Sequence, residues 1–143
     1  MPPAEAVRLL LAGDVMLGRG VDQVLPHPGD PWLFEDFVRS AEDYVRLAER
    51  VNGPIARPLA FEAIWGDALT ALARHPVDLR LVNLETAVTR RGRPAPKGIN
   101  YRMTPENLLA LTAFDVDVAT LANNHVLDWG EEGLVDTLDA LAA

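Results

Sequence analysis

The stretch Val7-Arg8-Leu9-Leu10-Leu11-Ala12-Gly13-Asp14-Val15-Met16 decides the fold predicted for this chain. An apolar run of this length that ends at a glycine is typical of a buried β-strand, and here an aspartate follows directly. The same pattern recurs twice, with Leu79 to Val82 before Asn83-Leu84-Glu85 and Val116 to Ala122 before Asn123-Asn124-His125. The carboxyl ends of parallel strands share one crevice in an open α/β sheet, so we expect these polar groups to form one site.

Helical segments and loops separate the three predicted strands. Apolar spacing predicts helices over 33–51, 66–74, 104–113 and 131–141, and Gly and Pro predict loops over 18–31 and 90–98. In the first of these helices, Phe34 and Phe37 belong to the apolar face and Glu35 to the solvent face. The order of strand, helices, strand, helix, strand, helix is typical of parallel strands joined by crossovers. We therefore predict an α/β fold with a largely parallel sheet flanked by helices.

Composition limits the classes of protein to which the chain can belong. Its 143 residues, 49% of them hydrophobic, are enough for a single domain over 1–143. A formal net charge of −8 argues against nucleic-acid binding, which needs clustered Lys and Arg. The chain has no cysteine, so any metal ion must be held by oxygen and nitrogen. No signal-peptide pattern and no apolar run near the ~20 residues of a membrane span are present, so we expect a cytoplasmic protein.

Two carboxylates at the predicted strand ends are candidate metal ligands. Asp14 follows the first strand, where a carboxylate can bind a hard cation, although an aspartate after a glycine also suits a turn or a cap. Asn83 and Glu85 are two residues apart, so both side chains point to the same side of the second strand. A glutamate that closes a strand can also be a simple surface charge. Two polar side chains on one side favour the functional interpretation.

The third cluster is the strongest local signal. Asn123, Asn124 and His125 follow an apolar strand and can supply both an amide oxygen ligand and a proton-transfer group. Asn also tolerates left-handed turns, and a single His is often structural. Asp128 lies three residues beyond His125, where its carboxylate can orient the imidazole or begin the last helix.

These motifs resemble those of a known family. The matching segments are Leu11 to Arg19, Asn83-Leu84-Glu85, Lys97 to Arg102, and Ala122 to Gly130, in this order over nearly the whole chain. They are similar to the CapA, or poly-γ-glutamate biosynthesis, proteins of bacterial capsules, which belong to the calcineurin-like metallophosphoesterase superfamily. The resemblance implies the N-terminal half of a four-layer α-β-β-α sandwich. It also implies a sheet face that a second chain could cover, as in a homodimer.

The resemblance to this superfamily further implies a two-metal site. Asp14, Glu85 and Asn124 would be metal ligands, and His125 would donate a proton or stabilise the leaving group, with Asp128 behind it. Met16 stands where other members have a ligand histidine. In the superfamily the remaining ligands, mainly histidines, come from a C-terminal half. The donor set Asp, Glu and Asn favours Mn²⁺ or Mg²⁺, with Fe or Zn²⁺ as alternatives.

A second group of residues is suited to holding an anionic substrate. Arg19, Lys97, Tyr101 and Arg102 supply cations and a phenol near the predicted strand ends, although a solvated loop explains them equally well. The other two histidines, His27 and His75, lie next to prolines outside any matching motif and are interpreted as structural or surface residues.

Three functional hypotheses follow from the sequence. The first is a metal-dependent hydrolase in which an activated water attacks an amide or ester of an anionic polymer such as poly-γ-glutamate. The second is a non-catalytic component that binds the polymer during capsule or polyglutamate biosynthesis. The third is a phosphoesterase that acts on small phosphate esters.

Overall fold

The sheet that the sequence predicts is present in the structure. The computed structural model describes residues 6–143, and its largest sheet contains β1 (Leu9–Val15), β2 (Leu79–Leu84) and β5 (Val118–Thr120). The strand order is β1-β2-β5, and both pairs are parallel. This topology confirms the predicted α/β class and brings the carboxyl ends of all three strands to the same edge of the sheet.

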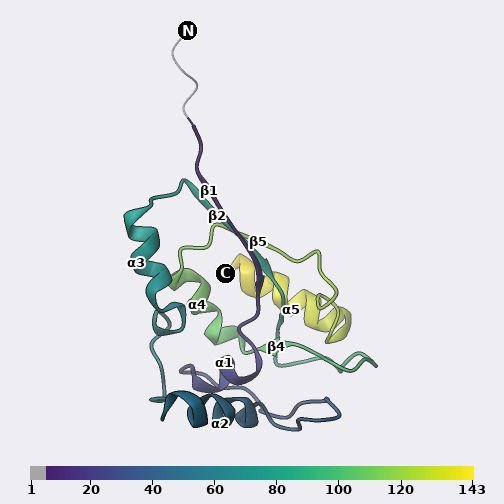
Figure 1. Cartoon of the computed structure of the whole chain (residues 1–143). Helices are drawn as coiled ribbons and strands as arrows, with labels where there is room; N and C mark the ends of the chain where they lie inside the picture. Colours follow the sequence, from purple (N-terminus) through teal and green to yellow (C-terminus); the bar gives the residue numbers. More distant parts are fainter. Residues whose placement is uncertain (1–5) are drawn as a thin grey trace.

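The helices lie around this sheet in the predicted order, with two additions, α1 (Arg19–Val24) and η1 (Ala63–Trp65). Figure 1 shows α1 and α2 (Ala41–Asn52) beyond the carboxyl end of β1, and α3 (Asp67–Arg74) beside the strands. A second, two-stranded parallel sheet pairs β3 (Ala87–Val88) with β4 (Arg102–Met103). The remaining bounds are η2 (Pro105–Leu108), α4 (Leu109–Ala113) and α5 (Gly130–Ala142).

The prediction of one continuous helix over 33–51 was wrong over 33–40. The helix begins at Ala41, because the Ser40 side chain caps it by accepting a hydrogen bond from the Glu42 N–H at 3.3 Å. Before it, Trp32 and Ser40 form an antiparallel bridge. The expected faces therefore do not apply to this segment: Phe37 is 72% exposed, whereas Glu35, expected in solvent, is 1% exposed.

Two other sequence expectations needed adjustment. The predicted loop over 18–31 contains α1, whose six residues are too few to give a periodic signal. Gly18, at its N-cap, lies so close to the backbone of β4 that an added Cβ would be 2.5 Å from the Arg102 carbonyl oxygen. The predicted helix over 104–113 is divided into η2 and α4, and the side chain of Thr104, at the N-cap of η2, donates to Asp22 instead of capping the helix.

A compact apolar cluster joins the two sheets to the helices behind them. Trp65 stacks on Phe114, with ring centroids 4.1 Å apart, and so ties η1 to the end of α4. Burial of these side chains is the main stabilising term of the fold, at roughly 25 cal/mol per Å² of apolar surface. The buried members of the cluster are Val15, Leu17, Leu25, Val82, Leu84, Val88, Met103, Ala110 and Leu111.

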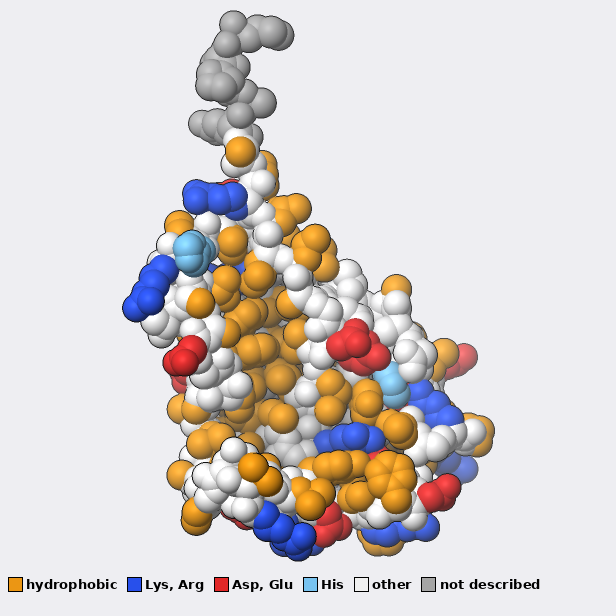
Figure 2. Space-filling view, in the orientation of Figure 1, with side chains coloured by type: hydrophobic (Ala, Val, Ile, Leu, Met, Phe, Trp, Pro, Cys, Tyr) orange, Lys and Arg blue, Asp and Glu red, His pale blue; other side chains and the backbone are white. Residues whose placement is uncertain are grey.

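The opposite face of the main sheet is incompletely covered. Leu9, Leu11 and Val118 have exposed fractions of 54%, 67% and 38%. Leu81 pairs with both Leu11 and Val118, so these side chains share one face. An apolar sheet face of this kind is expected in half of a sandwich. On the side of the sheet that α3 flanks, Figure 2 shows hydrophobic side chains gathered in a hollow between α3 and the strands.

Helix α5 is fixed to β3 by polar contacts as well as by packing. The Thr137 hydroxyl accepts a hydrogen bond from the Val88 N–H at 2.9 Å. The Asp136 carboxylate accepts hydrogen bonds from the Thr89 hydroxyl and from the Arg91 guanidinium. Hydrogen bonds from Arg91 and then Thr89 hold the pKa of Asp136 below its ordinary value.

We predict that Asp136→Asn lowers the free energy of unfolding by about 1 kcal/mol at pH 7, because the charge that these donors stabilise is removed. The folded-state pKa of Asp136 is lowered, so its contribution is complete above the ordinary Asp pKa of about 3.9. It is lost as the pH falls through the folded-state pKa. Urea unfolding at pH 7 and near pH 3 measures the difference.

The matched control is Asp139→Asn, an exposed aspartate on the same helix. It should change the stability little at either pH. Equal losses for the two variants at pH 7 would show that the contacts of Asp136 with Thr89 and Arg91 do not stabilise the fold.

Candidate functional site at the carboxyl ends of the strands

An irregularity at the end of β1 places Asp14 at the sheet edge. Ala12 pairs with Val82 and Val15 pairs with Leu84, so β1 has one more residue than β2 between these pairs. The extra residue makes a β-bulge, a feature that redirects side chains next to active sites. Asp14 has φ 49°, a left-handed conformation that Asp tolerates better than most residues. Its exposed side chain therefore leaves the regular alternation of the strand.

One amide lies between two carboxylates at this edge. Nδ2 of Asn83 donates to Oδ1 of Asp14 at 3.0 Å and to Oε2 of Glu85 at 2.5 Å. Asn83 and Glu85 therefore point to the same side of β2, as their spacing predicts. The two carboxylates are held close together by a neutral group, and the structure shows no ion pair from a Lys or Arg to either of them among residues 6–143.

Asn123 connects the end of the third strand to this pair. Its Nδ2 donates to Oδ1 of Asn83 at 2.9 Å and to the Leu84 carbonyl at 3.0 Å. Its Oδ1 accepts from the backbone N–H of His125 at 2.9 Å, which fixes the turn that carries the imidazole. Asn124 is exposed, and its backbone carbonyl accepts a hydrogen bond from the Lys97 ammonium at 2.8 Å.

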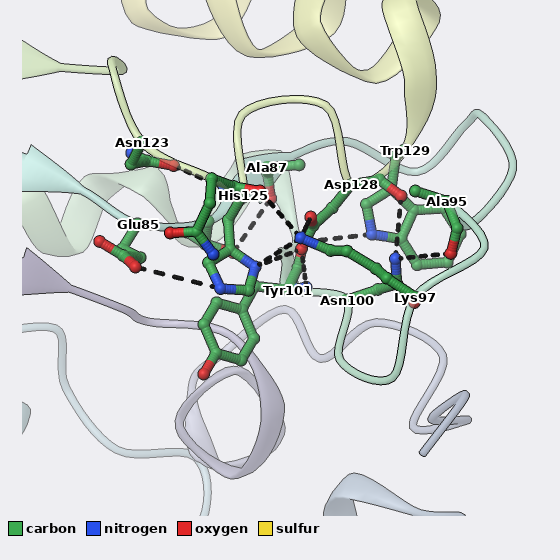
Figure 3. A network of polar contacts seen from close by, with 12 residues as sticks. Glu85, Ala87, Ala95, Lys97, Asn100, Tyr101, Asn123, His125, Asp128 and Trp129 are labelled. Atoms are coloured by element: carbon green, nitrogen blue, oxygen red, sulfur yellow. Dashed lines mark hydrogen bonds and ion pairs between the residues drawn. The ribbon is translucent and has the colours of Figure 1, made fainter. Parts of the chain in front are cut away.

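The imidazole of His125 is held from one side by a buried acid. Oδ2 of Asp128 is 2.6 Å from Nδ1 of His125 and also accepts the backbone N–H of Tyr101 at 2.5 Å. Asp128 has an exposed fraction of 1%, and its other oxygen pairs with the Lys97 ammonium. With Nδ1 donating to Asp128, Nε2 of His125 is the free nitrogen, and it lies 4.0 Å from Oε1 of Glu85. Figure 3 shows the imidazole between Glu85 and the Lys97–Asp128 pair.

A stack of flat groups supports the imidazole from below. The Tyr101 ring lies on the His125 ring with centroids 3.9 Å apart, as Figure 3 shows. The Arg19 guanidinium follows, 4.8 Å from the centroid of Tyr101 and 5.0 Å from that of Tyr44. Buried Glu35 pairs with Arg19 and accepts the Tyr44 hydroxyl at 2.9 Å. Burial, then the hydrogen bond to Glu35, raises the pKa of Tyr44, so its phenol remains a donor.

The structure brings most of the sequence-predicted residues together, in two groups. Asp14, Glu85, His125 and Asp128 share one hydrogen-bonded network with Lys97, and Tyr101 and Arg19 stack beneath it. Two predicted residues are exceptions. Asn124 meets the network only through its backbone carbonyl, which accepts from Lys97, and the residue is exposed. The other exception is Arg102. Its side chain lies on the other side of β4 from that of Tyr101, with its guanidinium 3.8 Å from the ring centroid of Trp129.

Sequence reasoning missed two residues of this site. Glu35 and Tyr44 anchor Arg19, but Glu35 looks like one of several charges on a predicted helix, and no spacing in the sequence separates it from them. The role of Asn123 had a signal that was available. It follows a strand that pairs with β2, so contact with Asn83 could have been expected from the parallel order.

The donor set fits a divalent cation in part. Two carboxylates that share one amide donor form a concentration of negative charge that a cation would compensate, and carboxylate and amide oxygens are the ligands that Mn²⁺ and Mg²⁺ prefer. Asp14 and Glu85 would hold such an ion. Asn124, the third predicted ligand, is exposed and follows Asn123 after the third strand. Over residues 6–143, no cluster of three or more His, Asp or Glu side chains is placed to hold a metal. This chain therefore offers a partial ligand set.

Comparison with known proteins identifies the family. The family model described as "Bacterial capsule synthesis protein PGA_cap" matches residues 8–143. The chain belongs to the PGA_cap family of bacterial capsule synthesis proteins. The match includes all three strand ends and the whole network around His125.

Named relatives agree with this assignment. The chain is 55% identical over 139 residues to a "Probable polyglutamine synthesis accessory protein" of Mycobacterium tuberculosis. The aligned segment covers 96% of the chain and 37% of that protein. The chain is 24% identical over 136 residues to "Capsule biosynthesis protein CapA" of Bacillus anthracis, covering 95% of the chain and 26% of that protein. A similar match, 24% over 130 residues, is to "PGA biosynthesis protein CapA" of Bacillus subtilis.

The chain spans between a quarter and two fifths of the length of the relatives that it matches, so the activity of a whole relative is a proposal for this PGA_cap chain. Within residues 6–143, none of the helices has the length and apolar character needed to cross a membrane.

We predict that Asp128→Asn lowers the free energy of unfolding by about 2–4 kcal/mol, because the buried carboxylate that receives the His125 and Tyr101 donors loses its charge. Chemical denaturation monitored by circular dichroism measures the loss. Asp115→Asn serves as the control, because Asp115 also pairs with a cation, Arg80, but its side chain is 80% exposed. A loss no larger than that of the control would contradict a stabilising role for the Asp128 network.

Proposed function

We propose that this PGA_cap chain contributes the first part of a metal-dependent hydrolase site, in which water attacks an amide or ester of an anionic polymer. The observation that carries the proposal is the pair of carboxylates at the strand ends, Asp14 and Glu85, held on one amide nitrogen. No purely structural reason requires two acids to converge there, because like charges this close disfavour each other.

Asp14 and Glu85, with Asn124, would hold the cation. A bound divalent ion would supply Lewis acidity at the bond under attack and lower the pKa of the attacking water. The chain's own side chains then have separate tasks. Asn83 orients both carboxylates through the two hydrogen bonds of its Nδ2. Asn123 holds Asn83 in turn, because Nδ2 of Asn123 donates to Oδ1 of Asn83.

His125 is the proposed proton donor to the leaving group. Its Nδ1 is held by Asp128 at 2.6 Å, which fixes the ring and turns Nε2 toward Glu85 and the sheet edge. A general acid must lie within hydrogen-bonding reach of the group that it protonates. With Nδ1–H donating to Asp128, the proton transferred to the leaving group is the second proton of the imidazolium form, carried on Nε2. Tyr101 keeps the ring in this plane by stacking on it.

The class of substrate is proposed from the names of the relatives. Two of them are named for capsule or PGA biosynthesis and one for polyglutamine synthesis. A polymer of glutamate units carries one carboxylate per unit and amide bonds between units. Its attraction to this site is supported by Lys97 and Arg19, although each already has an acidic partner.

We expect the purified chain with Mn²⁺ to release new amino groups from poly-γ-glutamate, and Asp14→Asn to reduce the rate by about a hundredfold, because a ligand of the ion is lost. Amine-reactive labelling of the products measures the rate. Asp139→Asn, an exposed change far from the strand ends, should retain full activity. Equal rates for the Asp14 and Asp139 variants would contradict the proposal.

A non-catalytic role in polymer binding is the second candidate, and one observation favours it. The ligand set within residues 6–143 lacks a third His, Asp or Glu. Binding of poly-γ-glutamate that is independent of Mn²⁺, with no new amino groups, would select this alternative. Hydrolysis of a chromogenic phosphate ester in place of the polymer would instead favour a phosphoesterase.

A further inference from the structure

A cavity lies on the far side of Tyr101 from the His125 imidazole. It has a volume of about 160 Å³, and its walls come from α1, the segment 29–34, β4 and the start of α5. Arg19 and Trp129 separate it from the strand-end site, because both line the cavity and both also contact Tyr101. The cavity is therefore a side compartment next to the proposed site.

Arg102 is the uncommitted charge in this cavity. One face of its guanidinium stacks on the Trp129 ring, which leaves the N–H groups in the guanidinium plane free. The structure shows no hydrogen bond or ion pair from these N–H groups to any residue within 6–143, and they are not sealed from solvent. The other two cations that line the cavity are already paired, Arg19 with Glu35 and Arg90 with Glu106.

The surroundings of Arg102 leave its charge only partly compensated. Asp22 and Asp30 line the same cavity and attract the guanidinium, and Arg90 repels it. Burial outweighs the attraction, so the pKa of Arg102 is lowered from its ordinary value. Asp22 is 3% exposed, and its carboxylate is engaged by other donors, because it accepts the Thr104 N–H at 2.9 Å and Asn107 Nδ2 at 2.8 Å.

The rest of the lining suits an apolar stem. The edge of Phe34 meets Trp129 with centroids 5.9 Å apart, and Trp32, 52% exposed, also lines the cavity. A cavity of about 150 Å³ in a protein core admits benzene, so this one has room for about six non-hydrogen atoms. A carboxylate with two or three methylene groups has this size.

A carboxylate fits the charges better than a phosphate does. The planar fork of one guanidinium matches a carboxylate in a bidentate pair. A phosphate dianion would bring a second negative charge toward Asp22 and Asp30 with no second free cation to receive it.

We propose that this cavity binds a single carboxylate on a short aliphatic stem, with Arg102 as the anchor and Phe34 and Trp129 against the methylene groups. The occupant that the position implies is the terminal unit of a polymer whose backbone lies at the neighbouring strand ends. Inner units of poly-γ-glutamate carry their free carboxylate directly on the main chain, whereas the last unit has a free γ-carboxylate on two methylene groups. That assignment rests on the proposed function, whereas binding of the carboxylate itself needs neither metal nor turnover. The two ideas can therefore fail separately.

The test is a titration of the metal-free chain with butyrate, a monoanion of this size, followed by the indole N–H signals in ¹⁵N-labelled protein. The chain has three tryptophans, of which Trp32 and Trp129 line the cavity. Trp65 is the internal control, because it stacks on Phe114 and donates to the Ala110 carbonyl elsewhere in the fold. We expect the Trp129 and Trp32 signals to shift in a saturable way and the Trp65 signal to stay.

Two variants assign the effect to the cavity. Arg102→Gln should weaken butyrate binding at least tenfold, whereas Arg93→Gln, an exposed arginine on the preceding loop, should leave it unchanged. If Arg102→Gln does not fold, Phe34→Ala replaces it. Phe34 is 42% exposed, and its removal should weaken butyrate more than acetate, because only butyrate has a stem to contact.

Three results would overturn the proposal. The first is the absence of any saturable shift at Trp129 in the parent. The second is butyrate binding that Arg102→Gln or Phe34→Ala leaves intact. The third is tighter binding of inorganic phosphate than of butyrate, which would show that the cavity selects a different anion. Loss of polymer hydrolysis with butyrate binding retained would contradict the proposed function alone.

Discussion

The site depends on one nitrogen atom. Nδ2 of Asn83 donates to Asp14 and to Glu85, and no other described donor joins the two carboxylates. For this to happen, β1 and β2 must be parallel and in the register that the bulge at the end of β1 creates. Asn123 then fixes Asn83 from β5, so the three strand ends are connected through two amides. A change of register in either strand pair would separate these groups.

The buried acids of the structure act at a distance from this pair and keep its surroundings rigid. Asp128 holds the His125 ring and pairs with Lys97. Glu35 holds Arg19 beneath Tyr101, and Asp22 ties α1 to η2 through Thr104 and Asn107. Each of these three acids has at least two donors, as burial of a charge requires. Among the described cations that line the neighbouring cavity, Arg102 is the one whose N–H groups remain available.

The sequence predicted the parts of the structure that rest on local patterns. The three strands, the positions of α3 and α5, and the shared direction of Asn83 and Glu85 all follow from periodicity and from strand geometry. The beginning of α2 was missed because Phe34 and Phe37 continue a helical spacing, while the cap at Ser40 and the bridge to Trp32 oppose it. The burial of Glu35 depends on contacts with Arg19 and Tyr44, which no local pattern contains. The position of Arg102 opposite Tyr101 required the pairing of β4, a strand of only two residues.

The most direct test of the central claim is a thermal unfolding series of the parent chain with increasing Mn²⁺. An ion that binds only the folded state must stabilise it, by about 2.7 kcal/mol at a hundred times its dissociation constant. The account predicts a rising melting temperature for the parent and for Glu62→Gln, an exposed control, and no rise for Glu85→Gln. A rise of the same size in Glu85→Gln, or none in the parent, would contradict the claim that Asp14 and Glu85 form a cation site.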